Sequence, residues 1–322
     1  MSAAPKASAP EIREEFCRPG QQDGILLLNK ERGLSSAACL TTIKRRLGQR
    51  RIGHAGTLDP MAEGLLVVLL GQATKISDPL MHAGEKIYSG VIRLGIVTDT
   101  WDAEGRILER LPVRGMDPGR VREACASFVG TYEQEVPAYS AAKHLGRPLY
   151  ELARRGLETP VKTKMVSVYR CEAELVDPER IFFRVSCASG TYIRSLAHSL
   201  GKRLGCGAML EKLTREYSRP FGIEKARALG EIVQNPEEFP GMVFSIAEAL
   251  PDWPHIRLGR EDAALIRMGK RLSVAADPGG PAPGRGLLLL EADGTALALA
   301  ECLAGEREGA FVLRATRGLW NT

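Results

Sequence analysis

The stretch from residue 53 to residue 75, GHAGTLDPMAEGLLVVLLGQATK, joins a glycine-rich loop to a long apolar run. Gly53 and Gly56 bracket His54, and Asp59 directly precedes a proline. Asp-Pro is a frequent turn signal, so Asp59 taken alone is more often a turn residue than a catalytic carboxylate. The run from 64 to 71 has the length and β-branched content of a buried strand, although its pattern also allows a helical segment.

Outward from this stretch, strands and helices are predicted in an irregular order. The predicted strands are 24–30, 64–71, 85–105, 164–176 and 180–188, and the predicted helices are 35–48, 117–129 and 189–205, the last with Thr191 near its cap. Strands and helices that do not alternate steadily favour an α+β domain with a mixed sheet. In the strand from 85, Tyr88, Ile92, Leu94 and Ile96 share one face, so Tyr88 is expected to point inward.

Three regions are expected along the chain. Residues 1–22, rich in Ala, Pro, Ser and charge, resemble a disordered tail. Residues 23–250 form the main domain, and prolines near 248–255 mark a boundary. Residues 251–322 contain short β-like runs around an exposed Gly/Pro-rich loop at 275–286, which predicts a small β-rich domain.

Composition limits the possible functions. No apolar run reaches the roughly 18 residues of a membrane span, and the first 24 residues lack an apolar signal core, so we expect a soluble, cytoplasmic protein. Seven cysteines without a CxxC pair and five histidines without metal-ligand spacing predict reduced thiols and no bound metal. The glycine-rich loops lack both the P-loop ending and GxGxxG, so no nucleotide cofactor is expected.

Net charge is +5, and its distribution is uneven. Residues 251–322 hold nine basic and nine acidic residues, so the positive excess lies in the first 250. The run KRRLGQRR at 44–51, immediately before the His54 loop, includes Arg45, Arg46, Arg50 and Arg51. Charge alone leaves two interpretations equally open: a solvated helix end, and a phosphate-binding segment.

Each of the other notable residues has an ordinary structural explanation when taken singly. Tyr88 on an apolar strand face is usually a core residue, and Arg194 in a first helical turn is usually solvated or paired. Together, Asp59, Tyr88 and Arg194 near predicted strand ends are compatible with a buried carboxylate held ionised by an arginine.

Several segments in order resemble the TruB family of tRNA pseudouridine synthases. The segment 53–75 resembles the G-H-x-G-x-L-D-P-x-A-x-G-x-L signature of that family. The other matching segments are LLLNKERGLSS (26–36), KIYSGVIRLGIVTDTWDAEG (86–105), EVPAYSAAKHLGRPLYELARRG (135–156) and CASGTYIRSLAHSLGKRLG (187–205). The resemblance therefore extends over about residues 24–225, and the C-terminal segment more weakly resembles a PUA-like RNA-binding domain.

The resemblance implies a role for each matching residue. Asp59 corresponds to the catalytic aspartate, Tyr88 to the tyrosine that stacks on the target base, and Arg194 to the arginine that pairs with the aspartate. The expected substrate-binding residues are His54, Tyr192, Leu213 and Lys30, together with Arg45, Arg46, Arg50 and Arg51. In this set His54 holds the RNA loop open, Leu213 is an apolar wall of the uracil site and Lys30 supports the active-site loop.

The implied reaction converts uridine at position 55, in the T-loop of tRNA, to pseudouridine. The base must leave its stack, its bond to ribose C1′ breaks, and it rejoins through C5, so no cofactor is expected. Asp59 could attack C1′, add to C6 or remove a 2′ proton, and the sequence leaves these routes open. The expected partner is the T-arm stem-loop of tRNA, without a guide RNA or a membrane, and the expected state is a monomer.

Two residues depart from the family pattern, and two alternative functions are to be weighed. Glu31 stands where the family usually has proline. Thr214 precedes Arg215 where the family often has two arginines, so both changes bear on RNA affinity.

A non-catalytic RNA-binding protein on the same scaffold would not need Asp59, Tyr88 and Arg194 together. A guide-RNA-dependent subunit is disfavoured by the absence of long basic tails.

Overall fold

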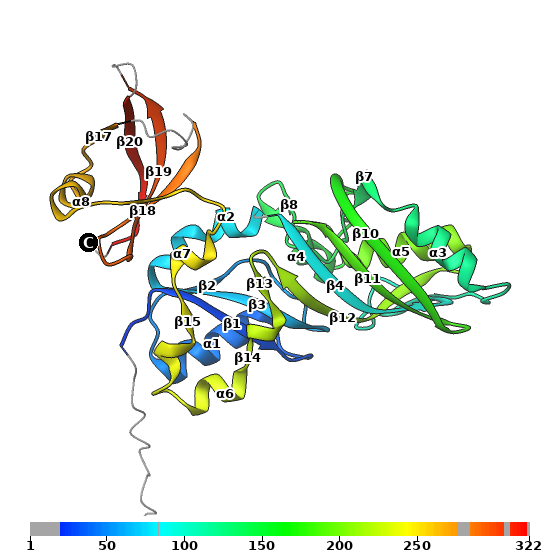
Figure 1. Cartoon of the computed structure of the whole chain (residues 1–322). Helices are drawn as coiled ribbons and strands as arrows, with labels where there is room; N and C mark the ends of the chain where they lie inside the picture. The colour runs from blue at the N-terminus through cyan, green and yellow to red at the C-terminus, as the bar shows by residue number, and fades with distance from the viewer. Residues whose placement is uncertain (1–19, 83, 276–283, 306–309, 321–322) are drawn as a thin grey trace, which may run out of the picture.

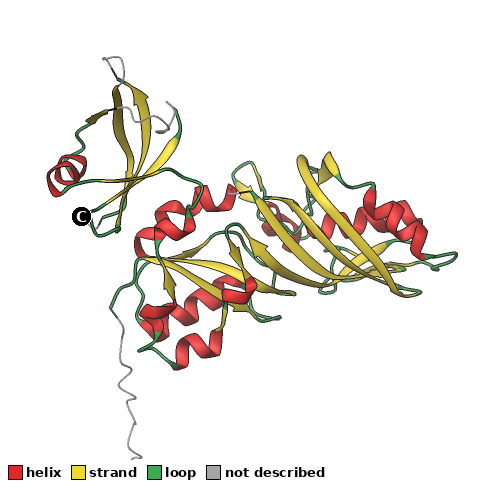
Figure 2. Cartoon of the chain, viewed as in Figure 1, coloured by secondary structure: helices red, strands yellow, loops and turns green. Residues whose placement is uncertain are grey.

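A computed structural model of the chain describes residues 20–82, 84–275, 284–305 and 310–320. An eleven-stranded sheet forms the larger part, and a five-stranded sheet forms the C-terminal part (Figures 1 and 2). Mixed strand directions and irregularly placed helices confirm the predicted α+β class. Most of the expected tail and of the loop expected at 275–286 lies outside the described residues.

The large sheet brings distant parts of the chain together. In spatial order its main strands are β14 (Arg227–Ala228), β1 (Gly24–Lys30), β3 (Ala62–Leu70), β12 (Ala208–Ser218), β4 (Glu85–Leu94), β11 (Arg180–Ala188), β10 (Thr163–Asp177) and β7 (Gly130–Glu135). Its short flanking strands are β2 (Ile52–His54), β13 (Phe221–Gly222) and β15 (Val243–Phe244). The pairs β1–β14 and β3–β12 are parallel and the others antiparallel.

Helices cover the large sheet. They are α1 (Ser36–Leu47), α2 (Ser77–His82), α3 (Pro118–Ala126), α4 (Leu149–Arg154), α5 (Ile193–Leu204), α6 (Leu229–Gln234) and α7 (Ile246–Ala249), with 3-10 turns η1 (Gly71–Ile76), η2 (Ile223–Lys225) and η3 (Phe239–Met242). The α1 helix begins because the Ser35 hydroxyl accepts a hydrogen bond from the Ala38 amide, and it ends at Gly48 in the left-handed region.

The helix expected over residues 189–205 begins later than predicted, although Thr191 lies next to its N-cap residue, as expected. The helix begins at Ile193, and the Thr191 hydroxyl donates to the Ala188 carbonyl instead of capping the helix. Tyr192 occupies the N-cap position without a side-chain bond. Arg194 nevertheless lies in the first turn, as expected.

Strand β3 is buried on both faces, which explains its unbroken apolar sequence. Leu66, Val68 and Leu70 belong to a core that includes residues of α1, α3 and α5. The alternate residues Leu65 and Val67 face a second core that includes residues of α7 and of the C-terminal sheet.

The single strand expected over residues 85–105 is wrong beyond Leu94. Strand β4 ends there, and Gly95 has a φ of 81°. A Cβ at Gly95 would lie 2.9 Å from the Leu111 carbonyl oxygen, so only glycine fits this bend. The chain then forms β5 (Ile96–Thr98), which pairs with β6 (Ile107–Arg110), so Ile96 leaves the face that Tyr88 and Ile92 share.

The C-terminal part contains β16 (His255–Arg257), α8 (Arg260–Arg267), β17 (Leu272–Ala275), β18 (Gly286–Leu290), β19 (Ala296–Ala304) and β20 (Ala310–Gly318). Its sheet order is β16-β18-β19-β20-β17. Strands β8 (Lys143–His144) and β9 (Arg147–Pro148) form a separate ribbon in the larger part. Among the described residues, no helix is long and apolar enough to cross a membrane.

Candidate active site

The loop that carries Asp59 is fixed at several points by hydrogen bonds to its backbone. The Ala62 amide donates to the Asp59 carbonyl at 3.1 Å, so the predicted Asp-Pro turn is present. The Ser36 hydroxyl donates to the Leu58 carbonyl at 2.9 Å and accepts from the Leu58 amide at 3.0 Å. These bonds tie the loop to the first turn of α1 and fix the backbone beside Asp59.

Arg194 is the partner of the Asp59 carboxylate. Its Nε lies 2.9 Å from Asp59 Oδ2, although the two residues are far apart in the chain. The Arg194 side chain is 6% exposed, whereas that of Asp59 is 38% exposed. The carboxylate therefore faces solvent while a buried guanidinium holds it in orientation, as a charge-assisted hydrogen bond does.

Both Nη atoms of Arg194 also donate a hydrogen bond. Its Nη1 donates to the Thr100 carbonyl at 3.2 Å and its Nη2 to the Tyr139 carbonyl at 3.0 Å. Both acceptors belong to loops distant in sequence from α5. The guanidinium thus has one available orientation, and this orientation aims Nε at Asp59.

A second carboxylate, which no sequence pattern predicted, also lies close to Arg194 Nε. Asp102 Oδ2 is 3.6 Å from Arg194 Nε, and Asp102 is 4% exposed. Its Oδ1 accepts from the Thr100 hydroxyl at 2.6 Å and from the Glu104 amide at 3.0 Å. Burial raises the pKa of Asp102, while the Thr100 bond and the Arg194 charge act in the opposite direction. The only sequence signal is its place in TDTWDAEG, at the end of the segment expected to be a strand.

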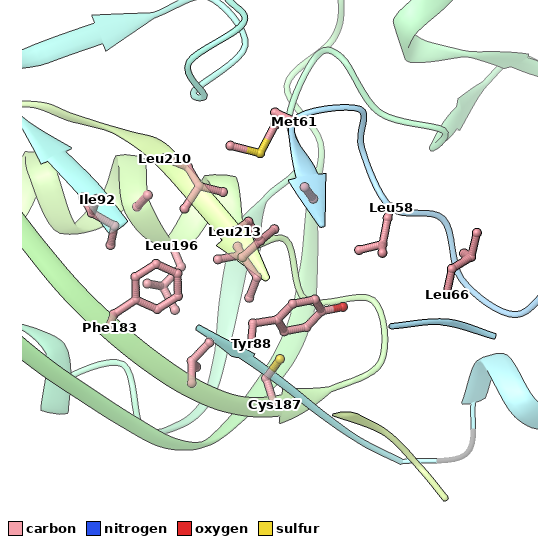
Figure 3. Packing of buried hydrophobic residues seen from close by; sticks show 14 of the residues in the cluster. Leu58, Met61, Leu66, Tyr88, Ile92, Phe183, Cys187, Leu196, Leu210 and Leu213 are labelled. Carbon is pink, nitrogen blue, oxygen red and sulfur yellow. The ribbon is translucent and has the colours of Figure 1, made fainter. Parts of the chain in front are cut away.

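Tyr88 lies on the buried face of β4, as predicted, and is 8% exposed. Its ring packs in the same core as Leu58 and Leu213, and in Figure 3 the hydroxyl points away from Phe183. Burial raises the pKa of Tyr88, while Arg215 on the neighbouring strand lowers it through its charge and a hydrogen bond. A neutral phenol therefore lies beside the loop that carries Asp59.

His54 ends β2 at the entrance to the same loop. Burial, and then the charge of Arg215, lowers its pKa, so its imidazole is neutral at pH 7. Its Nδ1 is buried and has no hydrogen-bond partner among the residues that the structure describes.

The other predicted substrate-binding residues are placed at different depths. Lys30 is fully buried and donates to the Leu34 carbonyl at 2.6 Å and to the Pro60 carbonyl at 3.4 Å. It therefore contacts the Asp59 loop from the protein interior. Tyr192 is half-buried, and its backbone exchanges two hydrogen bonds with the Gln134 side chain. Leu213 is buried beside Tyr88.

The predicted basic run is exposed and divided between two elements. Arg45 and Arg46 lie in the last turn of α1, where cations favour a helix C-terminus, so the solvated-helix interpretation fits this half. Arg50 and Arg51 lie in the loop that leads to His54. Among the described residues, no group of three or more His, Cys, Asp or Glu side chains could hold a metal ion.

Solved structures share the fold. The crystal structure of a Cbf5-Nop10-Gar1 complex matches with a TM-score of 0.70 at 24% identity, over 93% of this chain and 85% of that chain. The structure of an H/ACA RNP bound to a substrate RNA containing 2′-deoxyuridine matches with a TM-score of 0.69 at 22% identity, over 92% and 85%. These matches establish the fold of the chain.

Sequence comparisons identify the family to which the chain belongs. Residues 44–193 match the family model described as TruB family pseudouridylate synthase (N terminal domain), a range that contains Asp59 and Tyr88. The tRNA pseudouridine synthase B of Nitratidesulfovibrio vulgaris (strain Miyazaki F) is 50% identical over 94% of this chain and 98% of its own length. That of Oleidesulfovibrio alaskensis is 50% identical over the same shares. The chain belongs to the TruB family of pseudouridylate synthases, and it is an enzyme.

Proposed function

We propose that this enzyme converts uridine 55 in the T-loop of tRNA to pseudouridine and that Asp59 is the catalytic carboxylate. The relatives at 50% identity carry the name tRNA pseudouridine synthase B, which supports tRNA as the substrate. The observation that carries the proposal is the ion pair of 2.9 Å between Asp59 and Arg194, next to the buried Tyr88. An RNA-binding protein without catalytic activity would not need a carboxylate held in this way.

The reaction is an isomerisation that neither gains nor loses atoms. The bond from ribose C1′ to uracil N1 breaks, the base turns, and a bond from C1′ to C5 replaces it, after which the C5 proton moves to solvent and N1 takes one up. Asp59 acts on the ribose or the base in this step, and Arg194 holds its carboxylate toward the bound nucleotide. The proposed chemistry therefore needs a positioned carboxylate and no added cofactor.

The base must leave the RNA stack to reach Asp59, which costs a few kcal/mol. Stacking on the Tyr88 ring can recover about 1–3 kcal/mol of this. Leu213, beside Tyr88, offers the uracil an apolar wall. His54 stands at the entrance to the loop, where a neutral imidazole can occupy the place that the flipped base leaves.

We also infer that the enzyme acts alone, as a monomer without a guide RNA. The match to relatives named tRNA pseudouridine synthase B covers 94% of the chain, and the likeness to Cbf5 is one of fold. The basic run at 44–51 and the PUA-like C-terminal part then supply contacts to the T-arm.

The test is to incubate the purified protein with an unmodified tRNA transcript and to map pseudouridine along it. We expect conversion at position 55 without any added RNA or cofactor. A transcript in which uridine 55 is replaced by cytidine is the control, and it should yield no product. Tight binding of the transcript without any product would contradict the proposal and favour a non-catalytic RNA-binding protein.

A further inference from the structure

A buried lysine close to the active site lacks a partner. Lys86 lies two residues before Tyr88, on the same buried face of β4, and is 7% exposed. No hydrogen bond or ion pair joins its Nζ to another side chain within the described part of the chain, and Nζ is not among the fully enclosed polar atoms, so it stays open to solvent. Mostly buried cations in proteins are normally paired, so an ammonium that has no protein partner and reaches solvent is available to an anionic ligand.

A second cation lies next to this ammonium. Arg215 of β12 is 1% exposed, and it donates from Nε to the Leu65 carbonyl at 2.7 Å and from Nη2 to the Gly56 carbonyl at 3.0 Å. A Cβ built at Gly56 would lie 3.2 Å from Lys86 Nζ and 3.4 Å from Arg215 Nη1. Two positive groups therefore border the same small space above a glycine.

The surroundings of this space are positive. Burial and the Arg215 charge lower the pKa of Lys86 to about 8, while Cys187, its cross-strand partner on β11, acts in the opposite direction. His54 also faces Arg215, whose charge lowers its pKa. Glu85, the neighbour of Lys86 in sequence, points to the other face of β4 and accepts a hydrogen bond from the Ser186 hydroxyl. Among the described residues, no carboxylate contributes to the pKa shift of Lys86, so an anion entering the space would meet two cations.

Gly56 keeps this space open. Its φ is 96°, a conformation that side chains rarely adopt, and any side chain there would press against both cations. Gly56 also lies three residues before Asp59, so the space is next to the catalytic loop. Lys86 and Tyr88 are about 7 Å apart along the strand, which is within the span of one nucleotide from base to phosphate.

We infer that Lys86 and Arg215 form an anion subsite that receives a backbone phosphodiester next to the flipped uridine. This inference rests on the proposed function, because RNA supplies the anion. Lys86 contacts the phosphate directly, and Arg215, which is more deeply buried, holds the Gly56 carbonyl and adds its charge. The subsite thus fixes the flipped nucleotide by its backbone while Tyr88 holds its base.

The experiment combines a protein variant with a modified RNA. Lys86→Met removes the charge and keeps the length of the side chain. A T-arm stem-loop with a single methylphosphonate, which is neutral, is prepared for each linkage that flanks the target uridine. Dissociation constants are measured by fluorescence anisotropy for each combination, with Lys212→Met as the control, because Lys212 is an exposed lysine of the same sheet.

We expect Lys86→Met to weaken binding of the unmodified stem-loop about ten-fold, as the loss of one charged hydrogen bond does. One methylphosphonate should weaken binding to the wild-type protein by a similar factor, and the two changes together should be no worse than either alone. Lys212→Met should show no such coupling. Wild-type affinity in Lys86→Met, or independent effects at every linkage, would overturn the inference.

Two further measurements make the outcome unambiguous. Thermal unfolding should show Lys86→Met to be at least as stable as the wild type, because the substitution removes an unpaired buried charge. Product mapping with the wild-type protein is done on the same stem-loop. Product without coupling refutes the phosphate subsite alone, whereas absence of product refutes the proposed function.

Discussion

At the scale of single residues, Arg194 links the parts of the active site. Its Nε lies near the half-exposed Asp59 and the buried Asp102, and its two Nη atoms donate to two loop carbonyls. Since Asp102 is buried and lies 3.6 Å from Arg194 Nε, we expect it to act as a positioning residue for the guanidinium. This arrangement makes the orientation of Asp59 depend on a residue that substrate does not touch.

Asp102→Asn should lower kcat about ten-fold while leaving KM and RNA affinity close to wild type. The substitution keeps the shape of the side chain but removes the charge that faces Arg194, so Asp59 is held less firmly. Steady-state kinetics separate the two constants, and thermal unfolding checks that the fold is retained. A change confined to KM would show that Asp102 does not act through the catalytic pair.

Tyr88→Phe should retain RNA binding and reduce kcat at least about ten-fold. The ring still stacks on the base, but the hydroxyl that interacts with Arg215 is gone. Single-turnover product formation and a binding titration on the same stem-loop test this. Normal turnover would mean that only the ring of Tyr88 matters.

At the scale of elements, the loop after β5 is held against α5 by an aromatic stack. Trp101 has a φ of 63°, which is strained for a large side chain, and its ring lies 4.3 Å from that of His198 with an angle of 7° between the planes. The stack fixes the turn that carries Thr100 and Asp102, both of which contact Arg194.

His198 makes stability depend on pH. Burial, and to a smaller extent Lys202, lowers its pKa to about 4. Between pH 4 and its ordinary pKa near 6.5, the unfolded chain therefore binds more protons than the folded one. Its contribution to stability is complete above this window and disappears as the pH falls through it.

His198→Phe should keep the stack and remove this titration. The decrease in the free energy of unfolding between pH 7 and pH 5 should then be smaller than in the wild type by about 2 kcal/mol. Urea denaturation at the two pH values measures it, and His82→Gln, at an exposed histidine, is the control. Equal pH dependence in wild type and His198→Phe would contradict this account.

The helices and strands also show which parts of the fold and of the candidate site could be predicted from the sequence. Periodicity was sufficient for the hairpin of β10 and β11 and for α1, whereas β3, which is buried on both faces, was indicated by its length and β-branched content. It failed at Gly95, where a close backbone contact with Leu111 ends β4. Asp59, Tyr88 and Arg194 were identified by resemblance, whereas Asp102, Lys86 and Arg215 were missed. Their importance arises from contacts between distant strands and loops, which local sequence does not encode.

At the scale of the whole molecule, the two sheets share a core and a basic junction. Leu288 and Leu290 of the C-terminal sheet belong to the same core as Ile25 of β1. Lys75 Nζ donates to the Gly318 carbonyl at 2.6 Å, and Arg317 Nη1 donates to the Lys75 carbonyl at 3.1 Å. Burial, and then the charges of Arg51 and Arg317, lower the pKa of Lys75, so these three cations lie near one another where the two parts of the chain meet.

The basic run should govern the salt dependence of RNA binding. The variant carries glutamate in place of Arg45, Arg46, Arg50 and Arg51. We expect a higher KM and a smaller slope of log affinity against log salt, by about 0.7–0.9 for each phosphate that the variant no longer neutralises. Anisotropy titrations at several salt concentrations measure the slope. An unchanged slope would show that these arginines do not contact RNA phosphates and would favour the solvated-helix interpretation.

The central claim is that Asp59, oriented by Arg194, carries out the isomerisation, and Asp59→Asn tests it most directly. The amide keeps the size of the side chain but cannot act as the carboxylate. On an unmodified tRNA transcript, the account predicts no detectable pseudouridine at position 55 after exhaustive incubation, together with wild-type affinity for the RNA. Turnover by Asp59→Asn comparable to that of the wild type would contradict it.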